Sequence, residues 1–182
     1  ERAHLYELLG QRITGYVEPG YISDDMLRGY DDEILARANY SEHYSPVTEC
    51  GFVTNDDYGP MIGYSPDGLV ADDGLIECKS RRQKFHVETI LRNEVPAEHM
   101  LQCQSGLLVT GRRWLDFVSY CAGMPMFVKR VFPDASIQDA IIAAASDFED
   151  RMNASHLLYM ERIGSYPVLI NTERTNEQEI YA

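Results

Sequence analysis

The stretch YSPDGLVADDGLIECKS, from Tyr64 to Ser80, decides both the fold and the function that the sequence predicts. Pro66 and Gly68 flank an aspartate, which is typical of a turn, because proline presets φ and glycine tolerates positive φ. The predicted elements are a strand over 69–71, a second tight turn over 72–74 and a returning strand over 75–79. We therefore expect this stretch to form a β-hairpin.

Three charged side chains of the hairpin are predicted to meet. Asp67 stands at the start of the first strand, and Glu77 stands near the end of the second. Because side chains alternate across a strand, Glu77 and Lys79 share one face while Cys78 points away. Two carboxylates and an amine on one side are typical of a site for a hard cation with a charged partner.

A second segment contributes another acidic residue. Val47–Thr54 is rich in β-branched and small residues and predicts a strand that contains Glu49. A carboxylate inside an apolar strand is costly unless it is paired or bound to a cation, although Glu49 could equally face water. With a further strand over 61–64, the chain from 47 to 79 is predicted to form a meander carrying Glu49, Asp67, Glu77 and Lys79.

The rest of the chain predicts mainly helices around this meander. The predicted helices are 1–16, a helix capped by Ser23 and Asp24, 85–92, Pro96 to Thr110 with a stop at Gly111, and 135–159. The predicted strands are 114–121 and 126–132. On the second helix, Arg28, Glu33 and Arg37 are most simply interpreted as solvated surface charges. A stripe on the last helix is interpreted as core: Ile137, Ile141, Ala144, Phe148, Met152 and Leu158.

Length and composition indicate one soluble domain. The chain has 182 residues and 45% hydrophobic content, which is enough for a single core over residues 1–182 with a loose tail at 171–182. There is no apolar run long enough for a membrane span and no signal-peptide pattern. The four cysteines lie far apart without a CxxC motif, so we expect reduced, mostly buried thiols in a cytoplasmic protein.

The charge distribution permits a nucleic-acid partner. The net charge of −13 argues against one. However, nine basic and only four acidic residues lie between Lys79 and Arg130, which gives this segment about +5. An ordinary solvated surface explains the same counts equally well, and charge alone leaves both interpretations open.

Carboxylates without a histidine or cysteine cluster select Mg²⁺ or Mn²⁺ over zinc. Such an ion near a phosphodiester can lower the pKa of a water and stabilise charge on the pentacovalent phosphorus. Lys79 could orient or deprotonate that water and add positive charge. The spacing Asp-x9-Glu-x-Lys is moderately specific for this chemistry, because many proteins contain it by chance.

At these residues the sequence resembles a known family. SPDGLVADDGLIECKS is similar to the motif of the PD-(D/E)xK nuclease superfamily, and more narrowly to the lambda-type exonuclease (YqaJ-like viral recombinase) family. GYDDEILARANYSEHYSPVTECGFV resembles that family's helix and the strand after it, and HMLQCQSGLLVTGRRWLDFVSY resembles its Gln-x-Gln helix and next strand. The resemblance implies a restriction-endonuclease-like core, in which a central mixed sheet is flanked by helices. It also implies that an N-terminal part of the family domain is missing here.

The resemblance implies a set of metal ligands. Asp67, Glu77 and the Cys78 carbonyl would bind one Mg²⁺, for which Mn²⁺ could substitute. Asp67 and Glu49 would help with a second ion or its waters. Lys79 would be the catalytic lysine.

Further residues are implied around that centre. Gln102 would line the site as part of the catalytic set, and Ser65 matches a position near the terminal 5′-phosphate. Arg28 is a candidate for DNA contact, and Arg81 and Arg82 in the basic segment are further candidates.

The family implies a Mg²⁺-dependent exonuclease that digests one strand of duplex DNA from the 5′ end and leaves a 3′ overhang. A homotrimeric ring, a single-strand annealing partner and a role in phage or prophage recombination in a bacterial host are implied with it. Two departures from the family pattern are His99, where a tyrosine is common, and Ser80-Arg81 after the lysine, where Cys-Pro is usual. Two alternatives are a structure-specific or restriction-like endonuclease on the same core and a catalytically silent protein that mimics DNA or docks a partner.

Overall fold

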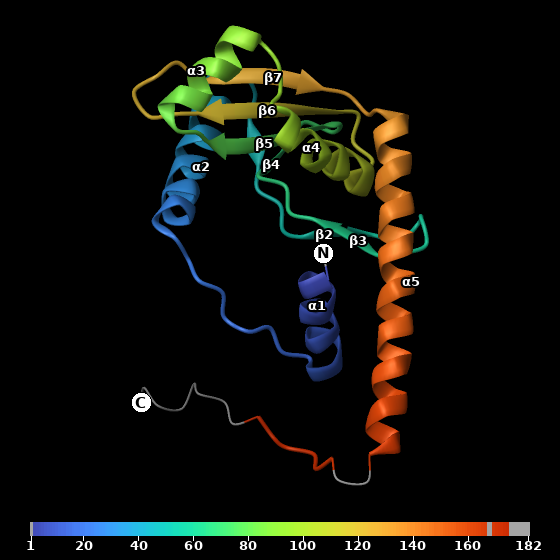
Figure 1. The fold of residues 1–182 in the computed structure, drawn as a ribbon. Coiled ribbons are helices and arrows are strands. Elements are labelled where there is room, and N and C mark those ends of the chain that lie inside the picture. Colours follow the sequence, from blue (N-terminus) through green and yellow to red (C-terminus); the bar gives the residue numbers. More distant parts are fainter. Residues whose placement is uncertain (1, 167–168, 175–182) are drawn as a thin grey trace. The chain divides into compact units, whose positions relative to one another are not determined.

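The predicted hairpin lies in a five-stranded mixed sheet, the centre of one of two units in the molecule (Figure 1). The computed structural model describes residues 2–166 and 169–174. The helices are α1 (Arg2–Thr14), α2 (Asp24–His43), α3 (Gln83–Arg92), α4 (Ala97–Thr110) and α5 (Ala135–Ser165). The strands are β1 (Val47–Thr48), β2 (Val53–Asn55), β3 (Ile62–Tyr64), β4 (Gly68–Val70), β5 (Gly74–Ser80), β6 (Trp114–Tyr120) and β7 (Phe127–Val131).

Strand β5 is the middle strand of the sheet, whose order is β1-β4-β5-β6-β7. It pairs antiparallel with β4 through the hairpin and parallel with β6, where Glu77 faces Phe117 and Lys79 faces Ser119. A parallel neighbour requires a crossover connection, which α3 and α4 supply between β5 and β6. The predicted mixed sheet flanked by helices is confirmed, and so is the predicted hairpin.

Helices cover both faces of the sheet within the unit Glu18–Asp147 (Figure 1). On one face, Tyr40 of α2 packs in a buried cluster with Cys78. On the other face, Leu107 of α4 packs in a cluster with Phe117. Because neighbouring strand residues point to opposite faces, Glu77 lies on the α4 face and Cys78 on the α2 face, as the alternation predicts.

The single strand predicted over Val47–Thr54 is wrong. This segment forms two short strands in two different sheets, since β1 pairs with β4 while β2 pairs with β3 in a separate two-stranded sheet. Residues 49–52 cross from one sheet to the other and belong to neither strand. The predicted continuous meander is therefore wrong as well, and Glu49 lies outside the strand that was expected to position it.

Helix ends follow local sequence signals closely. Ser23 caps α2 as predicted, and its side chain accepts a hydrogen bond from the Met26 N–H. Gly111 ends α4 with φ of 64°, a left-handed conformation that favours glycine. Pro96 is the N-cap residue of α4 and not its first helical residue, because its ψ of 138° is extended.

The stripe predicted as core on α5 is mostly not buried. Of its members, Met152 is buried, Ala144 and Leu158 are exposed, and the others are half-buried. The helix also runs beyond the predicted end at Tyr159. From Phe148 onward α5 belongs to a second unit with α1, where Met152 packs with Leu5 and Leu9. Among the described residues of this unit, the short helix α1 covers the long helix, which leaves much of the apolar surface of α5 exposed.

The thiols, the C-terminal tail and the absence of a membrane span were the remaining expectations from the sequence. All four cysteines are free thiols, three of them buried. Residues 171–174 of the predicted loose tail have no regular secondary structure, and 175–182 lie outside the described residues, as does Glu1 of the predicted first helix. None of the described helices has the length and apolar character that a membrane span requires.

The buried carboxylate of Asp116 links β6 to α2 and to β7, which predicts a stability effect. Asp116 of β6 accepts two hydrogen bonds of 2.8 Å from Arg130 and one of 2.6 Å from the Tyr40 hydroxyl. Asp116→Ala leaves both donors without their acceptor, so we expect a loss of about 2–4 kcal/mol in the free energy of unfolding by urea denaturation. Glu88→Ala breaks an exposed pair with Arg92 and should cost under about 1 kcal/mol. Equal losses in the two variants would contradict this interpretation.

Candidate active site

The hairpin turn places Asp67 against the neighbouring strand. Gly68 begins β4 opposite Ile76, and the backbone N–H of Cys78 donates a 2.6 Å hydrogen bond to Asp67 Oδ2. A Cβ on Gly68 would collide with the Val47 side chain, so the glycine lets β1 and the hairpin approach closely. The Asp67 carboxylate is thereby fixed beside β5, and its Oδ1 oxygen has no hydrogen bond within the described part of the chain.

Glu77 and Lys79 meet on the same face of β5, as the sequence predicts. The Lys79 amine lies 2.6 Å from Glu77 Oε1, while the Glu77 side chain is 1% exposed. The hydroxyl of Tyr64, at the end of β3, donates a hydrogen bond to Glu77 Oε2. Both oxygens of this buried carboxylate therefore have partners, one cationic and one neutral.

The acidic side chains of the site repel each other, and burial makes their ionisation unfavourable. Burial, and then the charge of Glu77, raise the pKa of Asp67 to about 7, although the hydrogen bond from the Cys78 N–H opposes both effects. The buried carboxylate of Glu77 and the half-buried carboxylate of Asp67 cannot both ionise freely, because one lysine amine offsets only one of them. A bound divalent cation would offset the second.

Helix α2 contributes an arginine and an acid to the site. Arg37 Nη1 donates a 2.9 Å hydrogen bond to the backbone carbonyl of Asp67 and lies 3.3 Å from Glu33 Oε1. The charge of Glu33 is among the causes that raise the pKa of Asp67. The interpretation of Glu33 and Arg37 as solvated surface charges is therefore wrong. The spacing of four residues between Glu33 and Arg37 on α2 was the sequence feature that could have indicated that they act together.

Glu49 is not brought to the other two acids. Its side chain is 79% exposed, and its ion-pair partner is Arg37, 3.4 Å away. Among the described residues, no three or more histidine, cysteine or acidic side chains gather closely enough to hold one ion. The expected convergence of three carboxylates is therefore not seen, and a ligand role for Glu49 stays a prediction.

The groups that are present fit a hard divalent cation. Asp67 and Glu77 offer carboxylate oxygens, and the Cys78 carbonyl follows directly after Glu77 in β5. Oxygen donors suit Mg²⁺ or Mn²⁺, and Mg²⁺ in particular is commonly held by one or two carboxylates while it keeps several waters. Asp67 and Glu77 match this donor set, and a bound cation would relieve the repulsion between their carboxylates.

The two glutamines of α4 have opposite environments. Gln104 is 1% exposed. Its amide donates to the Phe132 carbonyl and accepts from the Asp134 N–H, both at 2.9 Å, which ties α4 to the end of β7. Gln102, the predicted site residue, is exposed, and its role stays a prediction.

Comparison with known families shows where this arrangement occurs. The family model described as the YqaJ-like viral recombinase domain matches residues 3–113, more than half of the chain. The chain belongs to this family. No curated protein sequence matches it.

Solved structures agree with the family. The crystal structure of the alkaline exonuclease LHK-Exo from Laribacter hongkongensis is 36% identical, with a TM-score of 0.79 over 90% of this chain and 84% of that chain. LHK-Exo in complex with dAMP gives 35% identity and a TM-score of 0.80, over 90% and 85% of the two chains. A phage-related exonuclease from Haemophilus somnus 129PT, at 12% identity and a TM-score of 0.64 over 85% and 82%, shares the fold. The predicted family and the predicted class of enzyme, a nuclease, are confirmed.

His99, which departs from the pattern expected for the YqaJ-like family, lies beside the site. Its Nε2 atom is 2.8 Å from Arg81 Nη1, and its ring stacks on Phe117 with centroids 5.5 Å apart. Burial and then the charges of Arg81 and Lys79 lower the pKa of His99 to about 4. At neutral pH the imidazole is therefore uncharged and can accept a hydrogen bond from Arg81.

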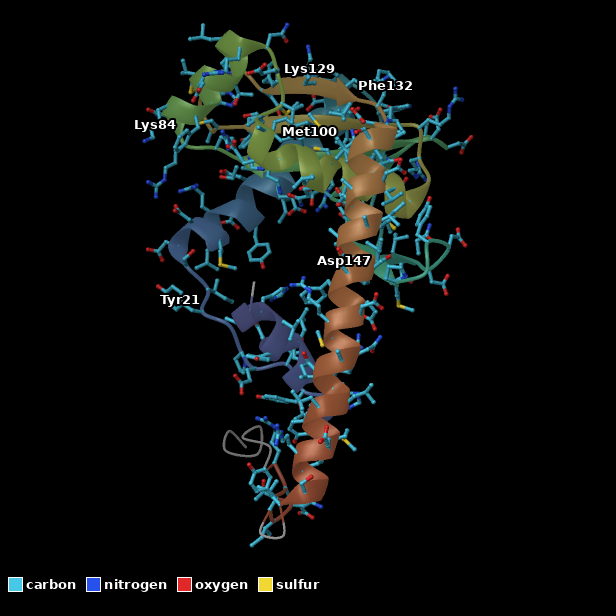
Figure 2. All side chains as sticks on the ribbon, turned by 45° about the vertical axis from the view of Figure 1, so that its right-hand side comes forward. Tyr21, Lys84, Met100, Lys129, Phe132 and Asp147 are labelled. Atoms are coloured by element: carbon cyan, nitrogen blue, oxygen red, sulfur yellow. The ribbon has the colours of Figure 1, made fainter. Side chains whose placement is uncertain are left out.

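The basic residues predicted to contact DNA gather at one depression. This depression, about 550 Å³ in volume, is lined by Arg28, Asp32, Arg81, Arg82, Gln83, Lys84, Cys121 and Ala122. Arg28 Nε donates a hydrogen bond to the Oγ atom of Ser80, the residue that follows Lys79 in the chain. Lys84 extends from the start of α3 (Figure 2). Asp25 forms ion pairs with both Arg28 and Arg82. Ser65, the other predicted contact, is exposed next to the hairpin turn.

The environment of His99 predicts a pH dependence of stability. The pKa of His99 falls from 6.5 to about 4 on folding, so the folded protein favours the uncharged imidazole. The contribution of His99 to the free energy of unfolding is therefore fully present above pH 6.5 and is lost as the pH falls toward 4. His99→Tyr should reduce the drop in unfolding free energy between those pH values by roughly 1–3 kcal/mol, measured by urea denaturation. The exposed His43→Tyr serves as the control and should leave the drop unchanged. The same drop in His99→Tyr as in the wild type would show that His99 is not responsible.

Proposed function

We propose that this member of the YqaJ-like family is a Mg²⁺-dependent exonuclease that degrades one strand of duplex DNA from the 5′ end. The observation that carries the proposal is the buried pair Asp67 and Glu77 with the Lys79 amine 2.6 Å from Glu77 Oε1. The matches to LHK-Exo, an alkaline exonuclease, support the exonuclease class. The 5′ polarity and the two-ion requirement rest on the family resemblance.

Each residue of the hairpin has a distinct part in the proposed reaction. Asp67, Glu77 and the Cys78 carbonyl would hold the cation, which supplies Lewis-acid activation of water and positive charge near the scissile phosphate. Lys79 directs its amine at that centre and can donate hydrogen bonds to a phosphate oxygen or to the attacking water. Arg37 holds the backbone of Asp67 from the α2 side, at 2.9 Å, and so fixes the direction of its carboxylate.

The depression beside Lys79 supports a path for the DNA backbone. Arg28, Arg81, Arg82 and Lys84 line this depression together with Asp32. Asp25 pairs with Arg28 and Arg82, and Glu98 pairs with Arg81, so a DNA phosphate would compete with these carboxylates for the arginines. Lysine and arginine contacts of this kind bind phosphates without reading the base sequence, as an exonuclease requires. Ser65 and Arg28 are proposed to lie near the 5′-phosphate, and Gln102 to line the site.

The wider assembly is proposed from the family resemblance alone. A ring-shaped homotrimer would enclose the duplex, and a single-strand annealing protein would receive the 3′ overhang. A bacterial cytoplasm and a phage or prophage recombination pathway would be the setting. Sedimentation of the purified chain with and without duplex DNA tests the trimer independently of catalysis.

The experiment that tests the proposal uses linear duplex DNA labelled at one 5′ end or one 3′ end, with closed circular duplex as a second substrate. With Mg²⁺, we expect release of labelled mononucleotide from the 5′ end first and no attack on the circle. Cleavage of the circle would instead favour an endonuclease. No cleavage at any Mg²⁺ or Mn²⁺ concentration would favour a protein without catalytic activity.

Substitutions assign the activity to the hairpin. Lys79→Ala and Asp67→Asn should each reduce the rate by at least about 10²-fold, because each removes a group that acts at the reacting phosphate. Lys79→Ala should still bind duplex DNA in a gel-shift assay. Lys129→Ala, a lysine of β7 that lies 3.4 Å from Asn93 Oδ1, is the matched control and should retain the wild-type rate. A folded Lys79→Ala variant with full activity would contradict the proposed role.

A further inference from the structure

Tyr64 lies behind the site in a position that nothing in the hairpin motif demands. It ends β3, in the small two-stranded sheet, and is 6% exposed. Its hydroxyl donates a hydrogen bond to Glu77 Oε2, so a residue outside the main sheet touches the buried carboxylate of the site. The sequence predicts Tyr64 only as the last residue of the strand over 61–64.

Helix α4 fixes where the Tyr64 ring can lie. A Cβ added at Gly106 would come within 2.6 Å of Tyr64 Cζ and 3.0 Å of its hydroxyl oxygen. No real Cβ is tolerated at the first of these distances without a shift of the ring. The absence of a side chain at Gly106 therefore creates the space that the ring occupies, and the helix backbone sets the depth of the hydroxyl.

The two oxygens of Glu77 are divided between different partners. Lys79 lies at Oε1, 2.6 Å away, and Tyr64 takes Oε2. The Tyr64 hydroxyl is the donor in its hydrogen bond, because a carboxylate oxygen can only accept. The Oε2 oxygen therefore has a neutral partner that is held in place by β3.

We propose that Tyr64 is a positioning residue that occupies Glu77 Oε2, so that the divalent cation would bind Glu77 through Oε1, the oxygen that it would share with the Lys79 amine. The inference rests on the proposed function, because it assumes that Glu77 is a ligand of that cation. Without the hydroxyl, the carboxylate loses a fixed orientation and retains a buried oxygen without a partner. Hydrogen bonds of this kind to ligating side chains commonly change metal affinity by about 10–100-fold.

The test measures Mn²⁺ binding directly, by electron paramagnetic resonance of free Mn²⁺ in the presence of the full chain. Tyr64→Phe should raise the dissociation constant by about tenfold. The nuclease rate of this variant should recover at high Mn²⁺, because only occupancy of the site has changed. Tyr40→Phe is the matched control, since it too removes a buried tyrosine hydroxyl from a carboxylate, that of Asp116, and it should bind Mn²⁺ as the wild type does.

Gly106→Ala gives a second test that keeps the hydroxyl but displaces the ring. It should weaken Mn²⁺ binding in the same direction, which protects the test if Tyr64→Phe folds poorly. Wild-type affinity in a folded Tyr64→Phe variant would overturn the role of Tyr64 while leaving the proposed function intact, provided that Asp67→Asn still abolishes binding. No saturable Mn²⁺ binding by the wild type would overturn both.

Discussion

The structure depends on the placement of two carboxylates, Asp67 and Glu77, in a buried site with one lysine. Burial, and then repulsion from Glu77, raise the pKa of Asp67 from its usual value of 3.8 to about 7. A protein that gains nothing from such an arrangement would be more stable without it. The surrounding contacts hold the two acids together: the Cys78 N–H and Arg37 on Asp67, and Lys79 and Tyr64 on Glu77.

These contacts reach both faces of β5, because it is the central strand of the sheet and both of its faces are covered. Its α4 face carries Glu77 toward the Tyr64 hydroxyl, and its α2 face carries Cys78 into the cluster around Tyr40. Arg37 comes from the same α2 helix and reaches the Asp67 backbone. Residues from β3, α2 and the hairpin meet at β5 because elements pack against both faces of this strand. The site residues therefore lie on the same strand as core residues.

The sequence predicts what depends on neighbours along the chain. The turn at Asp67, the alternation of Glu77 and Lys79 and the Ser23 cap follow from local chemistry, and all three are observed. What it could not predict depends on packing between distant segments. The break after β1 that leaves Glu49 exposed arises because β1 and β2 pair in different sheets, and the parts played by Arg37 and Tyr64 arise from contacts across α2 and β3. The α5 stripe is less buried than the sequence predicts for the same reason, because periodicity indicates an apolar face and not what covers it.

The central claim is that Asp67 and Glu77 are held together in order to bind one divalent cation. The most direct measurement is anomalous diffraction from crystals of this chain grown with Mn²⁺. A peak within ligand distance of oxygens from Asp67, Glu77 and the Cys78 carbonyl is the predicted result. Manganese bound elsewhere, or these oxygens found apart with no ion between them, would contradict the account.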